Sequence, residues 1–252
     1  MPITYKRDGE IAKIVLMRPE SLNAMDREMY RDANAAFTAF NEDEAAKVAV
    51  MSSACETSFS AGVDIKDVHR ALVDEKLPVE EVRDLFSLFF EAPGTINKPV
   101  IAALHGHCVG EGLVMSMFCD LRIAADDTTF ALPEAKIGVP AINGTIQAVQ
   151  LIGRAAAMEL LLTGGTRDAI WALRTGLVND VVPRKELANR ADAWAQQIAK
   201  NDQPALAIMR KLGDRALQEP FDDLVQFGSA LRDAQPTDAM VERQGNFINR
   251  RK

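Results

Sequence analysis

The stretch from residue 98 to residue 120 most constrains how this chain can fold. Its apolar run, residues 100–104, has the length and composition of a buried strand. Gly110 and Gly112 then permit close backbone approach just before an apolar helix over residues 113–118. A strand, a glycine turn and a helix start leave unpaired backbone N–H groups in front of the helix. Such groups suit an anion or a developing oxyanion.

A second turn of the same kind lies upstream, at residues 59–67. It consists of small residues that lead into a helix, so backbone N–H groups face outward there too. A single turn of this type is most often a packing turn. Two of them favour one binding site built from backbone donors.

The rest of the chain predicts a mixed α/β core up to about residue 190, followed by helices to the end. Strands are expected at 3–6, 11–17, 47–52, 121–124, 129–132 and 177–182, with a hairpin turn at Asp8-Gly9. Helices are expected from Asp26, over Pro78–Glu91, on both sides of Gly153 and over 168–175. Residues 68–77 are expected to form a polar helix or loop, and 133–144 an irregular segment.

Composition narrows the possible partners. The net charge of −7 is not concentrated in long runs, which disfavours nucleic acid. No apolar run approaches membrane-spanning length, and the three cysteines lack metal-type spacing. We therefore expect a cytoplasmic protein with reduced thiols, no membrane or nucleic-acid partner and no metal.

Six segments, in order and spacing, resemble the enoyl-CoA hydratase/isomerase (crotonase) superfamily. They are Arg18–Met25, Phe59–Lys66, Lys98–Gly112, Cys119–Ala125, Phe130–Gly138 and Leu161–Gly164. The resemblance implies an α/β fold: a crotonase-like spiral of ββα units over residues 1–190, with a helical trimerisation segment over 191–252. It also implies a homotrimer or a dimer of trimers. The implied substrate is an acyl-CoA thioester, with coenzyme A as part of the substrate and no separate cofactor.

The resemblance also assigns roles to residues. The oxyanion-hole amides map to Ala61 and Glu111, which lie at the two turns described above. The implied substrate-binding residues are Leu22, Asn23, Ala24, Ala61, Gly62, Asp64, Ile65, Lys66, Gly110, Val114, Pro133 and Pro140. Lys66, Arg250 and Arg251 are available to the phosphates of coenzyme A, although each is equally well an ordinary solvated charge.

The number of glutamates in the implied active site decides which reaction the resemblance favours. Hydratases of the superfamily use two glutamates, of which one maps to Glu134 and the other to Val114, which cannot transfer a proton. A single carboxylate at Glu134 suffices for an isomerase, because the proton that it removes is the one that it returns. Glu111 replaces a residue that is most often glycine, so it is either a substitute proton-transfer group or an acid turned away from the oxyanion.

Three alternatives to isomerisation stay open at this point. Hydration is the commonest activity of the superfamily. Hydrolysis of an acyl-CoA needs only a water positioned by Glu134 or Glu111. A non-catalytic subunit that binds CoA thioesters is suggested by the missing glutamate at Val114.

Overall fold

The computed structural model describes residues 1–91, 94–235, 241–242, 244–245 and 248. The chain forms two compact units, Met1–Asn201 and Asp202–Lys252. The first unit thus extends beyond the boundary at residue 190 expected from the sequence, because helix α7 (Leu187–Ala199) packs on the sheet of that unit.

The first unit is built on a six-stranded sheet with the order β1-β2-β3-β5-β7-β10. β1 (Ile3–Asp8) and β2 (Ile11–Leu16) form the expected antiparallel hairpin. The remaining strands run parallel to β2, and they are β3 (Val48–Ser53), β5 (Val100–Leu104), β7 (Leu121–Ala125) and β10 (Asp180–Val182). β5 is buried at every position, as expected for a central strand covered on both faces.

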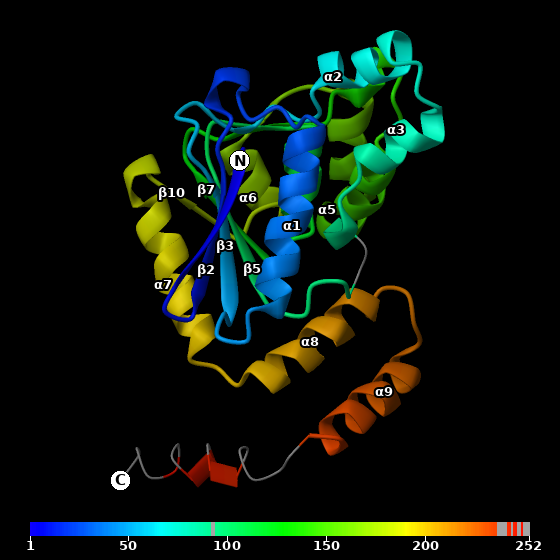
Figure 1. The fold of residues 1–252 in the computed structure, drawn as a ribbon. Helices are drawn as coiled ribbons and strands as arrows, with labels where there is room; N and C mark the ends of the chain where they lie inside the picture. The colour runs from blue at the N-terminus through cyan, green and yellow to red at the C-terminus, as the bar shows by residue number, and fades with distance from the viewer. Residues whose placement is uncertain (92–93, 236–240, 243, 246–247, 249–252) are drawn as a thin grey trace. The chain divides into compact units, whose positions relative to one another are not determined.

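The two covering layers follow from the alternation of side chains along the strands. Ala49, Met51 and Ala102 face the main core, which also contains α1 (Arg27–Glu42), whereas Val50 and Ile101 face α7. Figure 1 shows α1 and α7 on opposite sides of the sheet.

A smaller sheet has the order β4-β6-β8-β9. Its strands are β4 (Ser58–Ser60), β6 (His107–Val109), β8 (Thr129–Ala131) and β9 (Arg167–Asp168). β4, β6 and β8 directly follow β3, β5 and β7 of the larger sheet, and a helix or helical turn comes next each time. This repeat is the ββα unit expected from the sequence. It brings the turns after β4 and β6 to the same edge, because these two strands pair in parallel.

The helical elements of the first unit complete the core. They are η1 (Pro19–Ser21), α2 (Ile65–His69), η2 (Arg70–Asp74), α3 (Val79–Leu85), η3 (Phe89–Glu91), α4 (Glu111–Met117), η4 (Glu134–Ile137), α5 (Ile142–Thr163), α6 (Ala169–Thr175) and η5 (Arg184–Glu186). Within α5, Gly153 has non-helical backbone angles (φ 72°, ψ 160°), so the two helices predicted on either side of it are confirmed.

The helix predicted over Pro78–Glu91 was wrong at its C-terminal end. α3 stops at Leu85, and a separate turn, η3, follows. The cause is Asn34 of α1, whose side chain donates to the carbonyl of Ser87 (3.0 Å) and accepts from the amide of Phe89 (3.1 Å). These bonds occupy backbone groups that a continuous helix would pair internally. Glu91 is the last residue of η3, after this interruption.

The second unit contains α8 (Gln203–Arg215) and α9 (Phe221–Asp233). Leu212 of α8 packs against Gly228 of α9, and the Arg215 guanidinium lies 4.0 Å from the centre of the Phe227 ring. The sequence also predicts that the apolar residues of this segment need a partner surface, and they are Phe221, Leu224, Val225, Phe227, Phe247 and Ile248. Phe247 lies outside the described residues. Across the ranges that the structure describes, no helix has the length and apolarity needed to cross a membrane.

Candidate active site

The turns after β4 and β6 are in direct contact. A β-carbon built on Gly62 would lie 3.0 Å from the carbonyl oxygen of Val109 and 3.3 Å from the amide nitrogen of Glu111. Gly62 has φ +93° and Gly110 has φ +54°, a region that residues with side chains rarely adopt. Glycine at both positions therefore allows the two turns to approach each other.

The two predicted donors differ in their present partners. Glu111 begins α4, so its N–H has no acceptor within the helix. The N–H of Ala61 donates to the carbonyl oxygen of Leu22 at 3.0 Å. A ligand oxygen at this position would therefore share the Ala61 donor with Leu22 or replace that bond.

Glu134 lies against the second turn. It begins η4 directly after Pro133, and its Oε1 is 3.1 Å from the place where a β-carbon on Gly110 would sit. Its Oε2 is buried and has no hydrogen-bond partner among the described residues. Burial raises the pKa of Glu134, although its own backbone N–H partly offsets this effect. A buried acceptor without a partner, next to a backbone turn, is suited to receive a proton from a ligand.

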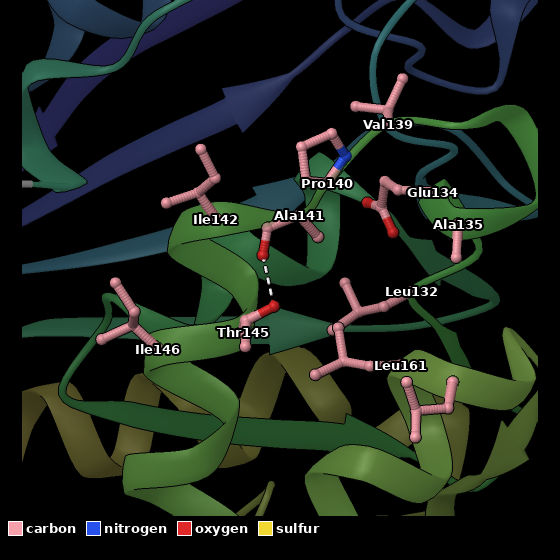
Figure 2. A pocket seen from close by; sticks show the side chains of 11 residues that line it. Leu132, Glu134, Ala135, Val139, Pro140, Ala141, Ile142, Thr145, Ile146 and Leu161 are labelled. Carbon is pink, nitrogen blue, oxygen red and sulfur yellow. Dashed lines mark hydrogen bonds between the residues drawn. The ribbon is translucent and has the colours of Figure 1, made fainter.

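An apolar pocket of about 420 Å³ opens beside Glu134. Figure 2 shows the Glu134 carboxylate at one side of this pocket and Ile142, Thr145 and Ile146 of α5 at the other. The lining residues are Leu132, Glu134, Ala135, Val139, Pro140, Ala141, Ile142, Thr145, Ile146, Leu161 and Leu162. Glu134 alone among these residues is ionisable, and the Thr145 hydroxyl donates to the carbonyl of Ala141 at 2.6 Å. Pro140, singled out in the sequence, thus lines the pocket.

Val114 lies behind the site rather than in the pocket lining. Its side chain is 3% exposed, and its Cγ2 is 3.0 Å from the place where a β-carbon on Gly144 would sit. It packs α4 against the first turn of α5 and carries no ionisable group.

The Glu111 carboxyl lies near Glu91 of η3, a proximity that the sequence did not predict. Asn143 donates to Glu91 Oε2 at 2.6 Å, and Glu91 Oε1 is buried without a hydrogen-bond partner among the described residues. Burial first, and then the nearby charges of Glu91 and Glu134, raise the pKa of Glu111 well above its usual range. The sequence offered one signal for a buried acid at this position: Glu91 directly follows the apolar residues Phe89 and Phe90, and Phe90 is buried.

Two residues predicted to bind the coenzyme, Asn23 and Asp64, use their side chains to hold neighbouring protein segments together. Asn23 is fully buried, accepts from the Arg18 amide (2.7 Å) and donates to Ser53 Oγ (2.7 Å) and the Phe59 carbonyl (2.9 Å). Asp64 caps α2 and pairs with Arg18 at 2.8 Å.

The remaining predicted coenzyme contacts differ in exposure. Leu22, Ile65 and Lys66 are exposed, and Ala24, whose carbonyl accepts from Arg18 at 2.6 Å, is half-buried. Arg250 and Arg251 lie outside the described residues. In the part of the chain that the structure describes, no group of three or more His, Cys, Asp or Glu side chains is arranged to hold a metal ion.

The family profile described as enoyl-CoA hydratase/isomerase matches residues 6–246. This chain belongs to that family. It is 32% identical over 251 residues to a probable enoyl-CoA hydratase of Mycobacterium bovis, covering 99% of this chain and 95% of that protein. It is 36% identical over 200 residues to the (E)-benzylidenesuccinyl-CoA hydratase of Thauera aromatica, covering 79% of this chain and 77% of that one.

A solved structure agrees with this assignment. The crystal structure of an enoyl-CoA hydratase from Bacillus anthracis superimposes with a TM-score of 0.88 at 28% identity, covering 99% of this chain and 97% of that one. The crotonase fold and the family predicted from the six sequence segments are therefore confirmed, and the chain is an enzyme of the enoyl-CoA hydratase/isomerase family.

Proposed function

We propose that this enzyme shifts the double bond of a β,γ-enoyl-CoA to the α,β position, with Glu134 as the proton-transfer group. The observation that carries the proposal is Glu134 Oε2, which is buried beside the pocket and has no hydrogen-bond partner in the described part of the chain. The position of the other family carboxylate holds Val114. A single base serves an isomerase because one proton leaves and returns.

The reaction follows from these positions. Ionised Glu134 removes a proton from the α-carbon, and the electrons of that C–H bond form an enolate whose negative charge lies on the thioester oxygen. The amides of Ala61 and Glu111 stabilise this charge. Removing one such donor typically costs about 3 kcal/mol of barrier. Protonated Glu134 then returns the proton to the γ-carbon, and the double bond comes to rest between the α- and β-carbons.

The apolar lining of the pocket favours a substrate whose acyl group is uncharged and apolar. None of its described lining residues is cationic, so a second carboxylate on the acyl chain would be buried there without a partner. The exposed Leu22, Ile65 and Lys66, together with Ala24, mark the path that we propose for the coenzyme A arm.

Other features of the family belong to the same proposal. We expect a cytoplasmic homotrimer or dimer of trimers assembled through the helical residues 191–252. We expect no metal and no cofactor beyond the coenzyme A of the substrate, and neither a nucleic-acid nor a membrane partner. Sedimentation at micromolar concentration tests the oligomeric state, and a monomer would contradict it.

Hydration is the second candidate. Glu111 provides a second carboxyl group near Glu134, and the named relatives are hydratases. Glu134 would take a proton from water as its oxygen attacks the β-carbon, and a proton would then be added to the α-carbon. Hydrolysis of the thioester would also need only a water oriented by Glu134 or Glu111.

Matched α,β- and β,γ-enoyl-CoAs, incubated in deuterated water, separated by chromatography and then analysed by mass, distinguish these reactions. Isomerisation interconverts the two substrates without adding the mass of water, whereas a hydrated product would refute the isomerase assignment. Free coenzyme A would indicate hydrolysis. No conversion of either substrate would favour a non-catalytic CoA-thioester binder.

A further inference from the structure

The helical segment formed by α2 and η2, residues 65–74, has little apolar anchorage in the core. Within this segment, all of which the structure describes, the buried residues are Ala71 and the charged Asp67. Its larger apolar side chains, such as Leu72 and Val73, are exposed. Burial of one alanine methyl group contributes little hydrophobic stabilisation. Polar contacts must therefore decide where this segment lies.

One arginine of α1 makes the principal polar contacts. Arg27 donates from Nε (3.2 Å) and Nη2 (2.9 Å) to the two carboxylate oxygens of Asp67, and its backbone N–H donates to Asp67 Oδ2 at 2.9 Å. It also donates from Nη1 and Nη2, each at 2.8 Å, to the two carboxylate oxygens of Glu75, the residue directly after η2. Each carboxylate is thus held by a pair of N–H donors, a geometry to which the planar guanidinium is suited.

The second cation of this cluster is Arg70. It contacts Asp67, and its Nε lies 3.8 Å from Glu75 Oε1. Arg70 belongs to η2 itself, so its contacts join the segment only to itself. Among the described residues, Arg27 is therefore the side chain that links both carboxylates to another element. That element, α1, is fixed by its own buried apolar side chains, which include Met29 and Phe37.

The segment held in this way carries two of the residues on the proposed coenzyme path. Ile65 and Lys66 directly precede Asp67 in the first turn of α2. Residues one and two positions apart on a helix point in different directions. Because Asp67 is turned inward to Arg27, Ile65 and Lys66 face outward, and both are exposed.

We propose that Arg27 is a positioning residue for coenzyme A, which holds Ile65 and Lys66 in place by binding Asp67 and Glu75 together. This inference rests on the proposed function, which places the coenzyme arm along α2. Without the guanidinium, the segment loses its side-chain link to α1, and the coenzyme has to order the segment as it binds. The affinity for coenzyme A then falls, because only the ordered fraction of the protein is ready to bind.

Calorimetric titration of coenzyme A into the full chain tests the inference without any turnover. R27Q should raise the Kd of coenzyme A about 10-fold relative to the wild type. R27K keeps the positive charge but cannot bind two carboxylates in pairs, so it should raise the Kd almost as much. R83Q, at an exposed arginine of α3, is the control and should leave the Kd unchanged. Hydrogen exchange should become faster over residues 65–75 in R27Q and stay unchanged in β5.

Kinetics with two matched substrates distinguish positioning from general destabilisation. The same enoyl group is offered as its coenzyme A ester and as its N-acetylcysteamine thioester, which lacks the nucleotide. R27Q should raise KM for the coenzyme A ester about 10-fold with little change in kcat. It should leave kcat/KM for the truncated thioester within about 2-fold of the wild type, because that substrate does not reach α2.

Three results would overturn the inference: an unchanged Kd in R27Q and R27K, an equal loss with both thioesters, or a wild type that does not bind coenzyme A. If R27Q does not fold, E75Q removes one of the two carboxylate contacts and should raise the Kd by a smaller factor. A Kd raised in R27Q without conversion of any enoyl-CoA by the wild type would support the role of Arg27 and refute the proposed function, so the two failures are distinguishable.

Discussion

Glu134 occupies the space that a side chain on Gly110 would need, with Oε1 3.1 Å from the position of the missing β-carbon. Gly110 also has φ +54°, so alanine there meets both backbone strain and the carboxylate. We expect G110A to displace Glu134 and to lower kcat about 100-fold, as displacements of about 1 Å can do. Steady-state kinetics with the preferred enoyl-CoA measures this.

The control for this substitution is G9A. Gly9 has a similar φ of +59° but nothing within 4 Å of the new β-carbon, so G9A adds backbone strain away from the site. It should lower stability without changing kcat. Wild-type kcat in G110A would show that the position of Glu134 does not limit the reaction.

Glu134→Gln should lower kcat by about 100-fold or more while the fold is retained, because glutamine cannot carry the transferred proton. Full turnover of every enoyl-CoA tested would remove Glu134 from the mechanism. Circular dichroism checks the fold of the variant.

The pH dependence of the wild type follows from the same residue. Glu134 must be ionised to accept a proton, and burial raises its pKa. Activity should therefore rise with pH through an acid limb lying above the usual glutamate pKa of about 4.3. The pH profile of kcat/KM reports this limb. A kcat/KM that does not fall as the pH is lowered to about 4 would contradict the assignment.

Asp67 should contribute to stability through its ion pairs with Arg27 of α1 and Arg70 of η2. Burial would raise its pKa, but hydrogen bonds from Arg27 (2.9 Å from the side chain) and from Arg70 outweigh this and lower it to about 2. Because the usual pKa of an aspartate is 3.8, this stabilisation is fully present above pH 3.8 and is lost as pH falls through about 2.

The test is urea unfolding of D67N across pH. D67N should lose on the order of 2 kcal/mol at neutral pH, and its difference from the wild type should shrink below about pH 4. D84N, at an exposed acid of α3, is the control and should change little. A D67N deficit that does not depend on pH would indicate lost packing instead.

The Asn23 side chain should be required for the stability of the fold rather than for contact with coenzyme A. N23A removes three hydrogen bonds whose partners are buried or half-buried and should destabilise the protein by about 3 kcal/mol. Asn23 also has φ +53°, which asparagine tolerates better than alanine does. Urea unfolding measures the loss, and stability within 0.5 kcal/mol or so of the wild type would contradict this role.

Much of the fold could be predicted because its signals are local. The helical spacing of Met29, Phe37 and Phe40 predicts α1, and the turn at Asp8-Gly9 predicts the first hairpin. The two glycine turns were also visible, because strand, turn and helix start follow each other directly in the sequence.

What could not be predicted depends on contacts between distant residues. The Asn34 side chain ends α3 by hydrogen-bonding to the backbone of Ser87 and Phe89, more than fifty residues further along the chain. Glu91 follows that interruption, so its proximity to Glu111 has no local signature. The bond from the Ala61 amide to the Leu22 carbonyl is equally invisible in the sequence, since it joins two loops.

Because α5 breaks at Gly153, two separate segments of this helix line the proposed acyl pocket. Ile142 and Ile146 come from the segment before the break, and Leu161 and Leu162 come from the segment after it. None of these four side chains belongs to the backbone donors or to Glu134. We therefore expect a combinatorial library on α5 alone to change the substrate range while Glu134 and the two backbone donors stay unchanged.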